Sequence, residues 1–107
     1  MATRLAFFGT SAFAVPLLAA LANDPRFEVA VAVTQPDRPV GRRQELASPP
    51  VKTAAGALGI PVLQPERMKA PEALERLQAF PFAAAVVASY GQILPQAVLD
   101  LAPERFV

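Results

Sequence analysis

The chain has 107 residues, of which 53% are hydrophobic and 18% are charged, and its net charge is +1. This length corresponds to one small domain or part of one, and the apolar content excludes wholesale disorder. Because cysteine and histidine are both absent, disulfides, thiol nucleophiles, Cys or His metal ligands and a Ser-His-Asp triad are excluded within these residues.

The first third of the chain predicts a strand, a helix and a second strand. Two apolar runs, Arg4–Phe8 and Phe27–Val33, are typical of buried parallel strands. The segment between them, 13–23, predicts a helix, so the three elements form a right-handed βαβ unit. The i, i+4, i+8 spacing places three apolar side chains on one face of that helix: Phe13, Leu17 and Leu21.

The next segment differs in composition. Residues 35–48 are rich in proline and arginine and too long for a connecting turn. Loops of this length without internal structure tend to be functional or mobile. We therefore expect a mobile basic loop over residues 35–48.

The remainder alternates helices and strands, which predicts an α/β fold with a parallel sheet. Phe82–Ala88 is apolar at every position, which favours a central strand buried on both faces. The strand containing Pro61 is expected near a sheet edge, because proline cannot donate to a ladder. The other expected elements are a helix over 51–58, a strand over 60–63, a helix within 66–80 that begins at Pro71 and buries Leu74 and Leu77, a short helix over 95–101, and the start of a strand at Phe106 and Val107.

The small-residue turn after the first strand is the first candidate site. Gly9, Thr10 and Ser11 precede a helix, and a helix N-terminus offers free backbone N–H groups to an anionic ligand. The alternative is an ordinary turn, since most α/β proteins need small residues there. The G-x-G-x-x-G fingerprint of dinucleotide binding is absent.

The basic loop is the second candidate site. Arg38, Arg42 and Arg43 lie within six residues on a proline-stiffened segment, and guanidinium groups bind phosphates through paired, permanently charged donors. The alternative is a solvated loop in which Arg38 merely pairs with Asp37.

The third candidate site follows the strand 82–88. Ligands of open α/β sheets bind beyond the carboxyl ends of the strands. Tyr90-Gly91-Gln92 and the apolar Ile93 and Leu94 could hold a flat heterocycle between side chains while backbone groups contact its edge. The alternative is an ordinary β-to-α turn that closes the core.

Five blocks of the sequence appear together in one register. They are FGTSAFAVP at 8–16, VTQPDRPVGR at 33–42, SPPVK at 48–52, PVLQP at 61–65 and SYGQILP at 89–95. They closely resemble the N-terminal part of the methionyl-tRNA formyltransferases, and the resemblance covers essentially the whole chain. It implies that residues 1–107 form the N-terminal portion of a Rossmann-like catalytic domain, with the rest of that domain and a C-terminal β-barrel domain outside this chain.

The resemblance also implies an activity and roles for the three candidate sites. The family transfers a formyl group from 10-formyltetrahydrofolate to the amino group of methionyl initiator tRNA, without a metal. Arg38, Arg42 and Arg43 would contact tRNA, with Arg42 the strongest candidate. The other implied roles are a methionyl-end pocket at Gly9, Thr10 and Phe13, and a folate pocket at Tyr90, Gly91, Gln92, Ile93 and Leu94.

The sequence departs from the family pattern in ways that affect these expectations. Glu45 puts a negative charge in the basic loop, which would lower tRNA affinity. The family's catalytic Asn, His and Asp have no counterparts before Val107, so the chain alone is expected to be inactive. Two alternatives stay open: another folate-dependent formyltransferase, and a non-catalytic α/β module that binds folate or RNA. With no apolar run of 18 residues and no signal sequence, we expect a cytoplasmic protein that does not bind a membrane. We also expect a monomer.

Overall fold

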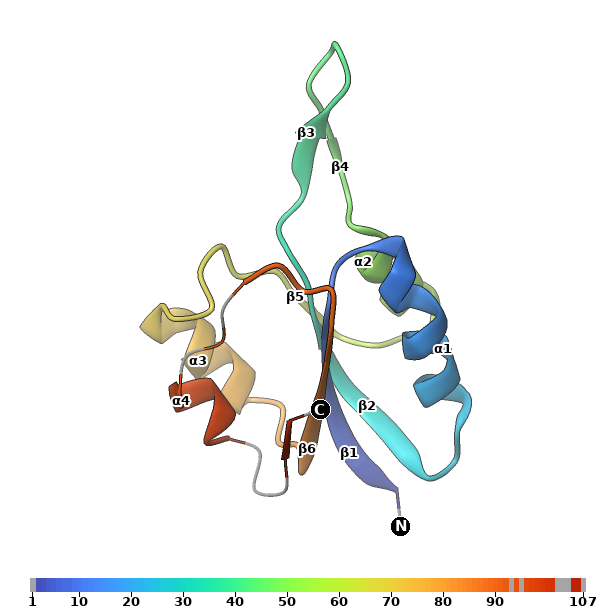
Figure 1. The fold of residues 1–107 in the computed structure, drawn as a ribbon, viewed down its shortest axis with the longest axis vertical. Coiled ribbons are helices and arrows are strands. Elements are labelled where there is room, and N and C mark those ends of the chain that lie inside the picture. Colours follow the sequence, from blue (N-terminus) through green and yellow to red (C-terminus); the bar gives the residue numbers. More distant parts are fainter. Residues whose placement is uncertain (1, 93, 95, 102–104, 107) are drawn as a thin grey trace.

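The computed structural model describes residues 2–92, 94, 96–101 and 105–106. These residues form a five-stranded parallel sheet of order β5-β2-β1-β6-β7 and a separate antiparallel pair, β3-β4. Figure 1 shows helices on both sides of the larger sheet and the β3-β4 hairpin standing away from it. The strands are β1 (Thr3–Gly9), β2 (Phe27–Val33), β3 (Arg38–Val40), β4 (Glu45–Ala47), β5 (Val62–Leu63), β6 (Ala84–Ala88) and β7 (Arg105–Phe106). The helices are the 3-10 turn η1 (Ala12–Ala14), α1 (Val15–Asn23), α2 (Pro50–Ala57), α3 (Pro71–Gln78) and α4 (Gln96–Leu99).

The core consists of two layers, one on each face of the sheet. Successive side chains of a strand point to opposite faces, so Phe7 and Phe8 of β1, both fully buried, belong to different layers. The Phe7 layer packs against α1 and α2, and the Phe8 layer against α3 and α4 (Figure 1). The helical residues in these layers are Ala14, Leu18, Val51 and Ala55 in the first, and Ala73, Leu77 and Val98 in the second. A parallel sheet covered on both faces confirms the predicted α/β class.

Several predicted elements are confirmed closely. The second strand has the predicted bounds, 27–33. Strand β5 lies at the sheet edge, as Pro61 indicated, and α3 begins at Pro71 and buries Leu77. Phe106 belongs to β7, which pairs with β6, so the predicted strand at the end of the chain is present. Ile93, Pro95 and Val107, named above, lie outside the described residues.

The predicted face of the first helix is wrong at two of its three positions, and only Leu21 packs partly against the core. Phe13 is 90% exposed and Leu17 is 40% exposed, whereas Ala14 and Leu18 are buried. The cause is η1, because a 3-10 turn has three residues per turn and shifts the phase of the side chains that follow. The α-helix therefore begins at Val15, and Phe13 lies before it.

The segment 35–48 has internal structure that was not predicted. Its residues 38–40 and 45–47 form an antiparallel hairpin, in which Pro39 faces Leu46. The chain reverses through Gly41 and Gln44, which have positive φ angles of 71° and 53°. Strands of three residues are too short to show a period in the sequence, and proline is tolerated in an edge strand.

Strand β6 is not the central strand that its uniform apolar sequence predicted. Strand β1 is central, and Val87 of β6 is 37% exposed. Strand β7 pairs only with Ala84 and Ala85. Within the described residues the rest of β6 therefore borders β1 alone, and its side chains are less covered.

None of the helices that the described residues form has the length and apolar character needed to cross a membrane.

Candidate functional site

The carboxyl ends of three neighbouring strands meet at the side chain of Thr10, directly after β1. Its hydroxyl donates to the carbonyl oxygen of Tyr90 at 2.7 Å and accepts from the backbone N–H of Gln35 at 3.3 Å. The Thr34 hydroxyl donates to it at 3.5 Å, and the Thr10 N–H donates to the carbonyl of Ser89 at 3.1 Å. Thr10 thus connects the segments that leave β1, β2 and β6, at the sheet edge where ligands of such folds bind.

Gly9 allows these strand ends to approach closely. A Cβ atom at this position would lie 2.7 Å from the Phe7 ring, 2.8 Å from the Ala88 carbonyl oxygen and 3.0 Å from the Ala14 Cβ. Its φ angle is not among the positive ones, so the requirement is for space and not for backbone conformation. Packing is therefore a sufficient reason for glycine here, whether or not a ligand binds.

The three residues expected at the methionyl end differ in how far they are exposed. Gly9 is buried and Thr10 is half-buried, whereas Phe13 projects from η1 into solvent. Ser11 accepts the η1 backbone bond from Ala14 at 3.0 Å. A 3-10 turn, and not an α-helix N-terminus, therefore follows the Gly9 turn.

Gln92 joins the segments after β6, β5 and β2. Its side-chain nitrogen donates to Gln35 Oε1 at 2.9 Å and to the Pro65 carbonyl at 3.1 Å. Its side-chain oxygen accepts from the Met68 backbone N–H at 2.7 Å. The amide is thus occupied by protein partners, and its local effect is to hold the segments 64–68 and 89–92 together.

Tyr90 has its side chain in the core. Its ring meets that of Phe8 edge-on, with centroids 5.6 Å apart, and only 2% of the residue is exposed. Burial raises the pKa of its hydroxyl to about 12, so it is protonated at neutral pH. Gly91, which follows with φ 98°, is exposed, and Leu94 packs partly against the core. Tyr90 and Gly91 therefore present backbone, more than side chains, at the strand ends.

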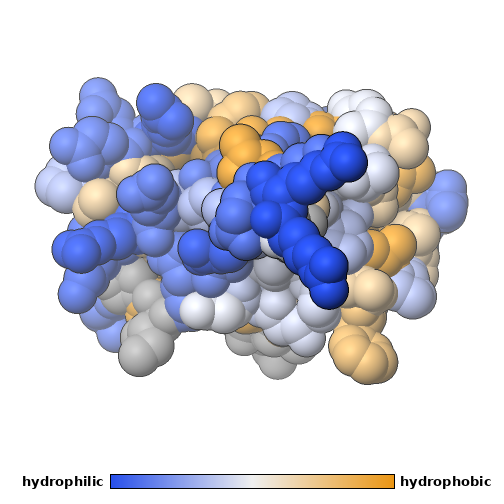
Figure 2. All heavy atoms as spheres, turned by 90° about the horizontal axis from the view of Figure 1, so that it is seen from above, coloured by the Kyte–Doolittle hydropathy of each residue, from blue (hydrophilic) through white to orange (hydrophobic). Residues whose placement is uncertain are grey.

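The β3-β4 hairpin displays the three predicted arginines. Arg38, Arg42 and Arg43 are all exposed, and Figure 2 shows strongly hydrophilic atoms rising over the hairpin in the centre of this end of the molecule. Arg38 makes a long contact of 3.5 Å with Gln35 Oε1. The alternative pairing of Arg38 with Asp37 is not observed, because the Asp37 carboxylate is bound by other residues.

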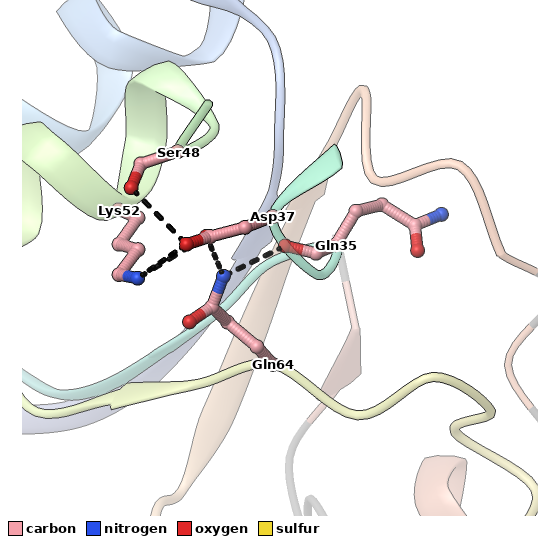
Figure 3. Close-up of polar contacts among 5 residues, drawn as sticks. All are labelled: Gln35, Asp37, Ser48, Lys52 and Gln64. Carbon is pink, nitrogen blue, oxygen red and sulfur yellow. Dashed lines mark hydrogen bonds and ion pairs between the residues drawn. The ribbon is translucent and has the colours of Figure 1, made fainter. Parts of the chain in front are cut away.

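Asp37 is a site residue that sequence reasoning missed. Lys52 Nζ lies 3.1 Å from both carboxylate oxygens, and Gln64 Nε2 donates to Oδ1 at 2.7 Å (Figure 3). Gln64 and then Lys52 lower the pKa of the Asp37 carboxyl below its ordinary 3.8. Since the folded-state pKa is lowered, this carboxylate stabilises the fold above pH 3.8, and the effect is lost as the pH falls through the lowered value. The only signal in the sequence was that all three residues belong to the quoted blocks.

A cavity of about 410 Å³ lies where the chain runs from β5 into α3. Sequence reasoning did not predict it, because its lining alternates acidic, basic and small residues without a motif. The cavity is lined by Leu63, Gln64, Pro65, Glu66, Arg67, Ala70, Glu72, Ala73 and Arg76.

Within the described residues, no three acidic side chains gather in a group that could hold a metal ion.

Two solved structures share this fold. Glycinamide ribonucleotide transformylase 1 from Symbiobacterium toebii superposes with a TM-score of 0.69 at 19% identity, covering 98% of this chain and 50% of that one. The enzyme of the same name from Geobacillus kaustophilus gives 0.66 at 21% identity, covering 99% and 56%. At these identities the likeness shows the fold alone.

Comparison of sequences identifies more similar relatives. The chain is 54% identical to methionyl-tRNA formyltransferase of Solibacter usitatus over 100 residues, and 50% identical to that of Geobacillus thermodenitrificans over 98. These alignments cover 94% and 92% of this chain but only 32% and 30% of the relatives, so the chain spans about 30% of their length. They confirm the resemblance drawn from the five blocks. Residues 3–107 match the family described as Formyl transferase, and the chain belongs to that family.

Proposed function

We propose that this chain is the part of a methionyl-tRNA formyltransferase that binds the initiator tRNA and forms one wall of the formyl-donor site. The observation that carries the proposal is the position of the arginine hairpin, which projects beyond the carboxyl edge of the sheet (Figure 1). A basic, exposed two-stranded arm next to a ligand-binding edge can bind the phosphates of a nucleic acid. The reactive end of that nucleic acid can then reach the edge of the sheet. Relatives at about 50% identity that carry this name support the same activity.

The acceptor, methionyl initiator tRNA, would extend from the hairpin to the turn after β1. Arg42 and Arg43, at the tip, and Arg38, at the base, would contact phosphates of the acceptor arm through charge-assisted hydrogen bonds. Phe13, which is 90% exposed, offers an apolar surface to the methionine side chain near Gly9 and Thr10. This arrangement favours an aminoacylated RNA over the small amine acceptor in the name of the fold neighbours, since exposed arginines that stand away from the sheet can reach several phosphates of a large acceptor.

The donor would bind at the segment after β6. Gly91 is exposed and has no side chain, so its backbone can approach the edge of a flat pterin ring. Leu94 supplies an apolar surface beside it. The expected chemistry is acyl transfer to the methionyl amine, with 10-formyltetrahydrofolate as donor, in the cytoplasm where translation initiates.

Donor binding at this segment is testable because Tyr90 is the sole tyrosine of the chain. We expect 10-formyltetrahydrofolate to shift the NMR signals of the Gly91 and Gln92 amides and of a ¹³C-labelled Tyr90 ring, and to saturate below about 1 mM, the upper end of ordinary substrate affinities. The control ligand is 4-aminobenzoylglutamate, which lacks the pterin and should leave these signals in place. Saturable shifts confined to other residues would contradict the donor assignment.

A further inference from the structure

The hairpin cannot fix its own direction. Its strands have three residues each, and residues 41–46, which form its tip and the start of β4, are all exposed. An isolated two-stranded ribbon is marginally stable in water. Whatever aims the arginines must therefore act at the base, where the chain enters β3 and leaves β4.

The carboxylate of Asp37 lies at that base and contacts the segments and the helix that surround it. Asp37 directly precedes β3, and Ser48, which follows β4, lies within 3.5 Å of its Oδ2. Lys52 on α2 binds both carboxylate oxygens, and Gln64 after β5 donates to Oδ1 (Figure 3). Asp37 thus joins the two ends of the hairpin to a helix and to the segment that follows β5.

Gln64 ties the same base to the sheet a second time. Its side-chain nitrogen also donates to the carbonyl oxygen of Gln35, at 3.2 Å, just before Asp37 (Figure 3). The Asp37 and Lys52 side chains are only 29% and 35% exposed, so water competes less for this pair than for a fully exposed one. The base is therefore held at two nearby positions, Gln35 and Asp37, of the segment that leads into β3.

We propose that Asp37 is a positioning residue that sets the direction in which the arginine hairpin leaves the sheet, and thereby aligns it with RNA. The inference rests on the proposed function of the hairpin as an RNA-binding arm. Asp37 itself would not touch the RNA, and its effect would be exerted through Lys52, Gln64 and Ser48.

The positioning role and simple electrostatics predict opposite changes in RNA affinity when Asp37 loses its charge. Removing a negative charge beside a basic arm should strengthen RNA binding, because RNA is a polyanion. If Asp37 positions the hairpin, Asp37→Asn should instead weaken binding of methionyl initiator tRNA, by about tenfold, since it removes the charged partner of several hydrogen bonds. Glu45→Gln is the matched control: it removes the same charge from exposed β4 and should strengthen binding by about twofold.

A second variant tests the position of the hairpin without changing the charge of the protein. Gln64→Ala changes no charge and removes both the 2.7 Å bond to Asp37 and the bond to Gln35. We expect it to weaken tRNA binding by about threefold. Affinities are measured by fluorescence anisotropy with the labelled tRNA, and thermal unfolding checks that each variant is folded.

Hairpin direction can be measured without RNA. The chain has no cysteine, so spin labels attached through Leu46→Cys on β4 and Ala20→Cys on α1, both exposed positions, report the distance between hairpin and body. We expect a narrow distance distribution in this background and with Glu45→Gln, and a broad one with Asp37→Asn or Gln64→Ala. Unchanged distributions in both latter variants, or tighter tRNA binding by Asp37→Asn, would overturn the positioning role.

The same measurements separate this inference from the proposed function. If Arg42→Gln with Arg43→Gln leaves tRNA affinity unchanged, the hairpin is not the RNA arm, and the proposed function fails. The distance distributions would still show whether Asp37 directs the hairpin. If the arginine variant loses affinity while Asp37→Asn gains it, the arm stands and the positioning role fails.

Discussion

Replacing Arg42 and Arg43 together by glutamine is expected to weaken binding of methionyl initiator tRNA about 100-fold at roughly 0.1 M salt. Each exposed guanidinium can make charge-assisted bonds to phosphate that contribute about 1.5–3 kcal/mol, and a factor of ten corresponds to about 1.4 kcal/mol. The salt dependence should change as well. The slope of log affinity against log salt should fall in magnitude by about 1.8, because each phosphate contact contributes about 0.9.

The control for this prediction changes the same net charge at the other end of the molecule. Arg4 and Arg26 are exposed at the start of β1 and just before β2. Figure 1 shows that both strands begin at the end of the molecule opposite to the hairpin. Arg4→Gln with Arg26→Gln should alter tRNA affinity by less than about threefold. Equal losses in the two double variants would mean that net charge, and not the hairpin, determines binding.

Replacing Gly9 by alanine is expected to destabilise the fold by about 1–3 kcal/mol, the usual penalty for overpacking a core. The added Cβ would approach the Phe7 ring and the Ala88 carbonyl oxygen within 3 Å. Phe7 is completely buried and Ala88 contributes backbone, so neither can move aside without separating β1 from β6. The shift should also distort the bond from Thr10 to Tyr90, which lies directly beyond.

The matched control is another glycine in regular structure. Gly56 lies in α2, and a Cβ there would meet no atom within 4 Å. Gly56→Ala should therefore stabilise the protein by about 0.5–1 kcal/mol, because alanine favours the helix. Urea unfolding followed by circular dichroism measures both variants. A Gly9→Ala protein as stable as the original would show that the close approach at this turn is not required.

Sequence patterns predicted the elements whose periods are long enough to read. The apolar run of β2 gave its bounds, and the proline positions located the edge strand β5 and the first residue of α3. The phase of the first helix could not be predicted, because the 3-10 turn before it has no distinctive composition. The hairpin was also missed, since its strands are too short for a period and one contains Pro39.

The site was predicted as a set of segments but not as a set of contacts. The blocks singled out the turn after β1 and the segment after β6 separately, and they did not predict that Thr10 meets Tyr90. They did not reveal that the Tyr90 ring lies in the core. Nor could they show that Asp37 binds Lys52 and Gln64, which are 15 and 27 positions away in the chain. Such contacts depend on how α2 and β5 pack, which no local pattern encodes.

The proposed function is tested most sharply by a chimaera. It joins residues 1–107 to the segment that follows the matching region in the Geobacillus thermodenitrificans relative, which is 50% identical over that region. The chimaeric protein is expected to transfer formyl from 10-formyltetrahydrofolate to methionyl initiator tRNA. The 107-residue chain alone, which has no histidine, is expected to give no turnover. A folded chimaera that binds neither tRNA nor donor and forms no formylmethionyl-tRNA would contradict the account, as would formylation by the chain alone.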